Sequence, residues 1–442
     1  MADVRPFAGV TYDPARVDMS RVLCAPYDVI SPAQQAAYLA RDPHNAVRIV
    51  LNPAPREARY SEAAATLRSW RGEGVLHLAS RAALYVHRHT FELPGKGRLM
   101  RTGLIAAVRL EPWSTGAVRP HEHTMPGPKQ DRLQLMRATR ADTEPIWVFH
   151  PDPTGEMRQR LESVTAREPM IDTEFVPEAD SDEAPAAERH QLWAVDDPSE
   201  TMELAAVAVA LPLYIADGHH RFETALLHAE ESGGSDDAPT RFKVMLLSAA
   251  EDPGLLVLPT HRMVRTAEPA LHSAFAKLLA DGWSNDDVAD LDALTARLAV
   301  PATVGTFGFG VFAGGRFGYL EGPIAAHAIE EVAPSIAALD VGLLHELILR
   351  PLLGVGAAEL AAGDRVAYAR DPREVESRVR TGDFNLGIFI RPPTLAQIQA
   401  VADAGENMPQ KSTYFWPKPA SGLVMALQEP HETPRARLLP GA

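Results

Sequence analysis

Short apolar runs separated by turn residues mark strands in the first part of the chain. Residues 83–86 and 104–108 are apolar runs of strand length, and the segment Pro-Gly-Lys-Gly at residues 94–97 lies between them. This arrangement predicts a β-hairpin, because proline and glycine favour the turn that joins two antiparallel strands. A further apolar run at residues 146–149 predicts another strand.

The period of the pattern changes after an apolar run at residues 213–216. Apolar residues then recur with the spacing of one helix face, at Phe222, Ala225, Leu226 and Ala229. Gly233 and Gly234 follow and are expected to stop this helix. The sequence therefore predicts a strand-turn-helix segment around residues 211–231.

Alternation returns in the last third of the chain. Apolar residues alternate on both sides of Gly314 and Gly315, which predicts a second hairpin; they are Phe307, Phe309, Val311, Phe317 and Tyr319. Residues 339–349 have the pattern of an amphipathic helix, which we expect Pro351 to end. Residues 384–390 alternate as a final strand.

This mixture of strands and helices predicts an α/β protein with mixed sheets and several domains. Residues 174–189 are acidic, rich in Ala and Pro and without a sustained period, so we interpret them as a surface linker. We expect an N-terminal α/β domain, a segment built around the strand-turn-helix unit, a C-terminal α/β domain and a tail, at residues 1–175, 190–265, 266–430 and 431–442.

Composition narrows the class of protein and its partners. The chain is 46% hydrophobic and 23% charged, as globular proteins are. Its net charge of −15 and the absence of a basic run argue against nucleic-acid binding. We expect neither a membrane partner nor secretion, because the sequence has no apolar stretch of about 18 residues and no basic N-terminus followed by an apolar core.

Cys24 is the only cysteine of the chain. It excludes an intramolecular disulfide and a cysteine-rich metal cluster, which suits a reducing cytoplasm, and we interpret it as a small buried residue. The bias towards Ala, Arg, Asp and Pro is typical of a high-GC bacterium.

The densest group of reactive side chains lies in the turn Asp217-Gly218-His219-His220-Arg221. A turn between a strand and a helix places backbone amides at the positive end of the helix dipole, where phosphate groups bind. Gly218 lets the backbone approach a ligand closely. The two histidines and Arg221 add donors for phosphoryl oxygens, and Asp217 is able to accept a proton or hold Mg²⁺. The alternative is an ordinary helix N-cap at Asp217 followed by surface histidines.

A second group, His121-Glu122-His123-Thr124, is followed by Arg132. In an extended strand His121 and His123 point to one face and Glu122 to the other, so a turn is needed to bring all three to one ligand. Glu122 is a candidate general acid or base, and His121, His123 and Arg132 are further site candidates. The alternative is a solvated loop that is rich in histidine.

Two further segments carry candidate ligand groups. Lys411-Ser412-Thr413 lies in an aromatic loop bounded by prolines and is able to hold a phosphate or a carboxylate, although it lacks the glycines of a P-loop. The alternative is a surface loop with a packed aromatic anchor. Asp28 lies in a turn before a helix that Ser31 caps and Pro32 begins, and it is another site candidate.

Six separated motifs resemble, in order, those of a bacterial and archaeal family, domain-of-unknown-function family 1015. The motifs are Arg5-Pro6-Phe7, residues 26–30, residues 121–124, residues 217–221, residues 339–341 and residues 408–413. The resemblance runs from about residue 4 to about residue 424. It implies an architecture more than a reaction.

The strand, Gly-x-x-Arg turn and helix also resemble the core motif of the ParB and sulfiredoxin superfamily, whose members bind a nucleotide phosphate at that turn and include kinases of free serine. Gly218 and Arg221 match its glycine and arginine, and Asp217 matches a frequent preceding acid. His219 stands where sulfiredoxin has its reactive cysteine, which excludes thiol chemistry. The sequence shows no helix-turn-helix and no basic surface, which argues against centromere binding.

This resemblance implies phosphoryl transfer involving a small hydroxylated metabolite, with serine or phosphoserine favoured and ATP, ADP or CTP with Mg²⁺ as the expected cofactor. The direction stays open, because the same residues would serve a kinase or, with water as the acceptor, a phosphatase. Asp217 or Glu122 would accept the hydroxyl proton. Arg221, His219, His220 and the helix amides would bind the phosphoryl group, and the segment Lys411-Ser412-Thr413 would hold a second anionic group. The two carboxylates are accordingly expected to lie in one cleft.

Two alternatives stay open at the level of sequence. One is a nucleotide- or metabolite-binding regulator without turnover. The other places a divalent metal between His121 or His123 and the pair His219-His220, although the spacing matches no compact histidine motif. Nothing in the sequence indicates the oligomeric state.

Overall fold

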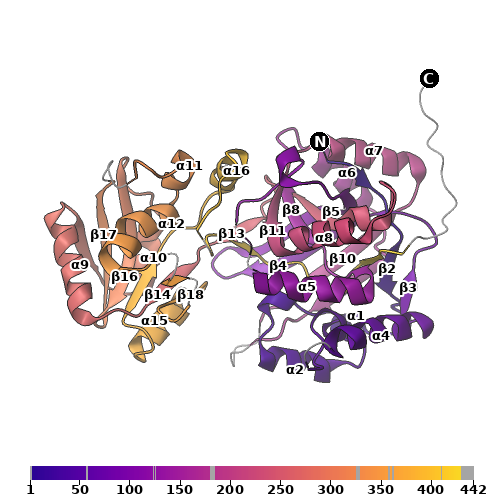
Figure 1. Cartoon of the computed structure of the whole chain (residues 1–442), viewed down its shortest axis with the longest axis horizontal. Coiled ribbons are helices and arrows are strands. Elements are labelled where there is room, and N and C mark those ends of the chain that lie inside the picture. Colours follow the sequence, from indigo (N-terminus) through magenta and orange to yellow (C-terminus); the bar gives the residue numbers. More distant parts are fainter. Residues whose placement is uncertain are drawn as a thin grey trace. The chain divides into compact units, whose positions relative to one another are not determined.

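The computed structural model describes residues 2–55, 58–122, 124, 126–179, 185–324, 329–356, 359–360, 363–409 and 411–429. The contacts of these residues divide them into two units. The first holds the described residues among 1–120, 124–256 and 417–442, and the second those among 121–123 and 257–416. Both units combine helices with a sheet, so the expected α/β class with mixed sheets is confirmed (Figure 1). The expected tail at residues 431–442 lies outside the described residues.

The first unit is built on a mixed sheet. Within the described residues its strand order is β6-β11-β8-β12-β5-β4-β10-β9, and β1 pairs with β5 at one side of this path. The β8/β12 and β6/β11 pairs are parallel, and the other neighbours are antiparallel. The bounds are β1 Val4–Arg5, β4 Leu84–Leu93, β5 Gly97–Arg109, β6 Val118–Arg119, β8 Ile146–His150, β9 Ile171–Phe175, β10 Glu188–Val195, β11 Leu213–Asp217 and β12 Phe242–Ala249.

The local predictions for this sheet are confirmed. β4 and β5 form the expected hairpin, with Leu93 paired to Gly97 across the turn. The run at residues 146–149 is β8, and the strand-turn-helix segment consists of β11 followed by α8 (His219–Ser232). Gly233 follows α8 with a positive φ of 62°, as a stop signal requires.

The expected linker at residues 174–189 lies between two strands of this one sheet. β9 ends at Phe175, β10 begins at Glu188, and the two strands pair antiparallel. β10 also pairs with β4. Residues of the first two expected domains therefore share one sheet, because hydrogen bonds between strands join segments that composition alone separates.

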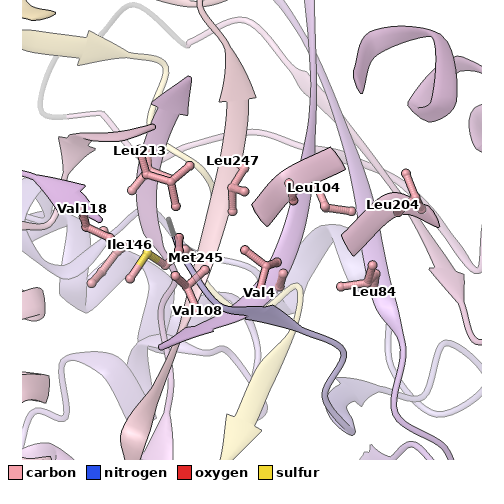
Figure 2. Packing of buried hydrophobic residues seen from close by; sticks show 14 of the residues in the cluster. Val4, Leu84, Leu104, Val108, Val118, Ile146, Leu204, Leu213, Met245 and Leu247 are labelled. Carbon is pink, nitrogen blue, oxygen red and sulfur yellow. The ribbon is translucent and has the colours of Figure 1, made fainter. Parts of the chain in front are cut away.

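One face of the sheet carries the main apolar core of the first unit. Alternate residues of the central strands, such as Leu104 and Val108 or Met245 and Leu247, belong to one buried cluster (Figure 2). Helices α6 (Glu156–Thr165), α7 (Pro198–Val209) and α8 supply the opposing apolar side chains. Phe222 of α8 is fully buried in this cluster and stacks on Trp113 with ring centroids 4.1 Å apart.

The remaining elements of the first unit include a small sheet with the order β3-β2-β21-β7. Ser31 caps α2 and forms a capping box with Gln34, which confirms the helix start expected there. The bounds are β2 Gly9–Tyr12, β3 Leu76–Leu78, β7 Ala141–Asp142, β21 Met425–Leu427, α1 Met19–Val22, α2 Pro32–Arg41, α3 Val47–Val50, α4 Ala58–Gly72, α5 Pro126–Thr139, and the 3₁₀ turns η1 Tyr27–Val29, η2 Trp113–Thr115 and η3 Pro239–Arg241.

The second unit has an antiparallel sheet with the order β15-β17-β16-β19-β14-β18. β16 and β17 are the hairpin expected around Gly314 and Gly315. Helices α10 and α15 pack apolar side chains on the sheet. The bounds are β13 Leu256–Leu258, β14 His261–Val264, β15 Ser284–Val288, β16 Thr306–Ala313, β17 Arg316–Pro323, β18 Val366–Ala369, β19 Leu386–Phe389, β20 Tyr414–Trp416, α9 Glu268–Ala280, α10 Leu291–Leu298, α11 Pro334–Ala337, α15 Pro372–Arg380 and α16 Leu395–Asp403.

The helix expected at residues 339–349 is longer than the sequence pattern indicated. It begins as α12 (Asp340–Leu343), continues as the π-helix η5 (Leu344–Leu349) and then as α13 (Arg350–Leu353). The expectation that Pro351 ends it is wrong. The chain stays helical through Pro351, which follows the π-helical segment, and the helix ends at Gly354 in the left-handed conformation.

The described helices set one limit on any role at a membrane. None of them is both long enough and apolar enough to cross a lipid bilayer.

The packing of α8 on the sheet leads to a prediction about stability. Phe222→Ala removes a fully buried ring and its stack on Trp113, so we expect the free energy of unfolding to fall by about 3–5 kcal/mol. Leu227→Ala, on the same helix, is the control, because Leu227 is 44% exposed and its loss should change stability by only about 0.5 kcal/mol. Urea denaturation of both variants measures the difference, and equal losses would contradict this packing of α8.

Candidate functional site

The turn between β11 and α8 has the geometry that a close approach of backbone and side chain requires. Gly218 is the N-cap of α8 and has a φ of 107°, in the left-handed region that side chains disfavour. A Cβ atom at this position would lie 3.1 Å from Nε of Arg221. Glycine is therefore needed both for the backbone conformation and for the space that the Arg221 guanidinium occupies.

Asp217 does not cap the helix, contrary to the alternative considered from the sequence. One oxygen of its carboxylate accepts a hydrogen bond from Arg221, four residues later. The other lies 2.7 Å from Nζ of Lys418, which also forms an ion pair with Asp28. Asp28, Asp217, Lys418 and Arg221 therefore form one alternating chain of charges.

The Arg221 guanidinium is held inside the protein by this chain of charges. The residue is 8% exposed, and its Nη1 donates to the Pro145 carbonyl at 2.5 Å. Burial by itself lowers the pKa of Arg221, but the carboxylates of Asp217, Glu144 and Asp28 outweigh burial and hold this pKa above its ordinary value. Arg221 is thus a fixed cation that orients Asp217 at the start of α8.

Arg132 extends the same network from α5. Its guanidinium lies over the ring of Tyr27 at 3.7 Å from the ring centroid, and its Nη1 is 3.6 Å from the Glu144 carboxylate. That carboxylate also accepts hydrogen bonds from the Tyr27 backbone amide at 3.2 Å and from Ser421 Oγ at 2.7 Å. Arg132 and Asp28, which the sequence marked as separate candidates, thus lie in one polar cluster with Asp217.

A cavity of about 20 Å³ lies beneath the turn, lined by charged groups that include Arg132, Glu144 and Arg221. This volume is that of about one water molecule, far less than a nucleotide needs. Lys243 and Asp142, each 3% exposed or less at the side chain, form an ion pair at its edge. The Asp217 side chain, by contrast, is 17% exposed.

The two histidines of the turn have different access to solvent. His219 is 5% exposed, whereas His220 is only partly buried. His220 is therefore the histidine that is able to meet a ligand from outside the protein. Among the described residues, the side chains whose ligand atoms lie close enough to share a metal ion are His89, Glu188 and His190, and not these two.

The other candidate residues form a separate group in the second unit. Glu122 forms a β-bridge with Met408, and its carboxylate accepts a hydrogen bond from the backbone amide of Lys411 at 3.3 Å. His121 Nε2 lies 3.0 Å from Thr413 Oγ1, and Ser412 Oγ donates to a nearby carbonyl. Glu122 thus holds the turn that presents Lys411, which has a positive φ of 57°. His123 lies outside the described residues.

The sequence-predicted residues thus fall into two groups, one in each unit. The expectation that Glu122 approaches Asp217 stays a prediction. Lys418 and Glu144 are central to the first group, yet the sequence did not assign them a role. Cys24 is fully buried, as expected, and burial raises the pKa of its thiol well above the ordinary value.

Comparison with solved structures gave distant similarities. A free serine kinase in complex with AMP aligns at 11% identity and a TM-score of 0.33, over 71% of this chain and 86% of the kinase. SbnI with a C-terminal truncation from Staphylococcus aureus aligns at 9% identity and a TM-score of 0.33, over 73% and 81% of the two chains. A conserved hypothetical protein from Pyrococcus furiosus aligns at 13% identity and a TM-score of 0.33, over 71% and 90%. These likenesses assign no role to any residue of this chain.

Comparison with curated proteins found no match. A family model described as a protein of unknown function, DUF1015, matches residues 4–342. This span includes the turn at residues 217–221 and the segment at residues 121–124, whereas residues 408–413 lie beyond it. Because the match covers well over half of the 442 residues, the chain belongs to the DUF1015 family of proteins of unknown function.

Proposed function

We propose that this protein is a phosphoryl-transfer enzyme that acts on a small hydroxylated metabolite, with a nucleotide as the phosphoryl donor or acceptor. The observation that carries the proposal is the Asp217 carboxylate at the start of α8, placed between the cations Arg221 and Lys418. A carboxylate in an anion-binding turn requires neutralisation, and here two fixed cations supply it. The turn therefore keeps an acceptor for a proton or for Mg²⁺ beside donors for phosphate.

The groups of the turn have distinct roles in this proposal. The first backbone amides of α8 and the partly buried His220 would bind phosphoryl oxygens. Arg221 is a positioning residue, because its Nη1 and Nη2 already donate within the protein. The ammonium group of Lys418 lies between the carboxylates of Asp28 and Asp217. We assign Lys418 to the bound phosphate, whose negative charge it would help to neutralise.

The substrate and the direction of transfer belong to the finer part of the proposal. Serine or phosphoserine is favoured by the resemblance of the Gly218 to Arg221 turn to that of superfamily members that phosphorylate free serine. ATP, ADP or CTP with Mg²⁺ is the proposed nucleotide, and we assign the cation to the carboxylates of Asp217 and Asp28, which also contact Lys418. Catalysis would come from positioning and charge neutralisation. Lys411, Ser412 and Thr413 remain candidates for a second anionic group.

A regulator that binds a nucleotide without turnover is the second candidate. It is favoured by the same ion pairs, because Asp217 is fully engaged with Arg221 and Lys418 and already has a structural role. Incubation of the purified protein with ATP or ADP, serine or phosphoserine and Mg²⁺, followed by mass spectrometry of the products, separates the two candidates. A transferred phosphoryl group supports the enzyme, and nucleotide binding without any transfer supports the regulator.

The position of Lys418 generates a prediction about binding. Lys418→Met removes the cation between Asp28 and Asp217, so we expect ADP binding to weaken by about 1.5–3 kcal/mol, the value of one charge-assisted contact. Lys277→Met is the matched control, because the Lys277 side chain is 60% exposed and pairs with Asp281 at the end of its own helix. Calorimetric titration measures both affinities, and an unchanged affinity in Lys418→Met would remove this residue from the site.

Turnover measurements on two variants decide whether Asp217 or Glu122 is the general base. Asp217→Asn keeps one hydrogen-bond acceptor for Arg221 but loses the charge and the second oxygen, which faces Lys418, so we expect turnover to fall by about 10²–10⁴-fold while the nucleotide still binds. Glu122→Gln keeps an acceptor for the Lys411 amide and should leave turnover nearly unchanged if Asp217 is the base. Melting temperatures recorded for both variants identify a loss that comes from unfolding. The opposite ranking of the two turnover rates would assign the base to Glu122.

A further inference from the structure

A second polar cluster lies on the first unit's sheet, away from the turn of Asp217 in the sequence. His87 and His89 are on β4, and Glu188 and His190 are on the neighbouring strand β10. His190 pairs with His89 in the register of these antiparallel strands, so the two rings stand side by side, with centroids 4.2 Å apart. Leu84 and Val86 of β4 belong to the main apolar core, and the alternation along the strand places His87 and His89 on the opposite face of the sheet.

The geometry of this cluster is that of a set of metal ligands. His89, Glu188 and His190 each offer one ligand atom, and these atoms all lie within 4.8 Å of one another. Nε2 of His190 is 3.7 Å from Oε2 of Glu188, and Nε2 of His89 is 2.7 Å from the same oxygen. Ligands about 2.0–2.1 Å from a tetrahedral ion are separated by about 3.4 Å, so small movements of the side chains suffice to enclose one.

One of these ligand atoms, Nε2 of His190, is buried and makes no hydrogen bond within the described residues. The whole His190 residue has no exposed surface. A buried nitrogen without a partner is costly, and native proteins rarely leave one. A metal ion would give this nitrogen a partner. Neutral imidazole is the form that binds a metal ion.

We propose that His89, Glu188 and His190 bind one divalent transition-metal ion, with Zn²⁺ as the best match. Two imidazole nitrogens and one carboxylate oxygen are ligands that Zn²⁺ accepts, whereas Mg²⁺ and Ca²⁺ prefer oxygen ligands throughout. The Glu188 side chain is 13% exposed and gives the ion a path from solvent. The fourth position of a tetrahedral ion is left to water.

Neighbouring groups support the ligands and also limit the affinity. His87 Nε2 lies 3.1 Å from Nδ1 of His190 and fixes the orientation of that ring, as an outer-sphere partner does. Arg101 donates to Nδ1 of His89 at 3.2 Å, so this ring carries its proton on Nε2. Metal binding through Nε2 moves that proton to Nδ1, and Arg101, which can only donate, must then give up the contact.

Zinc binding to the full chain tests the proposal. The protein is stripped with EDTA, desalted and titrated with Zn²⁺, and with Co²⁺ as a spectroscopic probe. We expect about one tightly held ion per chain, Co²⁺ absorption bands typical of tetrahedral coordination, and a melting temperature that rises with Zn²⁺ and not with Mg²⁺. A parent protein that is folded but retains no Zn²⁺ overturns the proposal.

Variants locate the ion within the chain. Glu188→Gln and His190→Ala should each weaken Zn²⁺ binding more than about 100-fold, and His87→Gln, which alters an outer-sphere partner, by about 10–100-fold. His261→Gln is the control, because His261 is a buried histidine of the second unit outside this cluster. Circular dichroism selects folded variants, and Glu188→Gln suffices if His190→Ala does not fold. Unchanged Zn²⁺ affinity in folded Glu188→Gln overturns the proposal.

Discussion

The ion pair between Arg221 and Asp217 is the interaction on which the arrangement of the turn depends. Arg221 is nearly buried, so its charge requires a fixed partner, and an unpaired charge at this depth would cost several kcal/mol. Gly218 supplies the space that the guanidinium needs. The second oxygen of Asp217 engages Lys418, from the far end of the sequence, which ties the segment after residue 416 to the same unit as β11 and α8.

Further buried charges surround this pair and are themselves compensated. Lys243 pairs with Asp142, and Glu144 receives hydrogen bonds from Tyr27 and Ser421 while Arg132 lies nearby. Burying such a network costs desolvation free energy, and replacing a buried ion pair by apolar residues often stabilises a protein. In the proposed function, this network would set the electrostatics of the turn before a ligand binds, as phosphoryl transfer requires.

Local sequence patterns predicted the local elements well. Both hairpins, the strand at residues 146–149, the helix cap at Ser31 and the β11-α8 segment follow from periodicity and turn residues alone. The sequence pattern predicted a wrong helix end at Pro351, because a proline is compatible with more than one position in a helix. A proline often ends a helix but also occurs inside one where the hydrogen-bonding pattern is irregular, and here a π-helical segment precedes Pro351.

The sequence by itself determined the family, the α/β class and the composition of the turn from Asp217 to Arg221, because an i, i+4 ion pair and a glycine N-cap are set by neighbours along the chain. Only the tertiary structure decided that Lys418 and Asp28 join this turn and that His89 meets His190. These residues are far apart in the sequence, and their contacts form only when the strands pair in the right register. That register depends on the side chains of the whole sheet and not on one segment. No single motif carries that information.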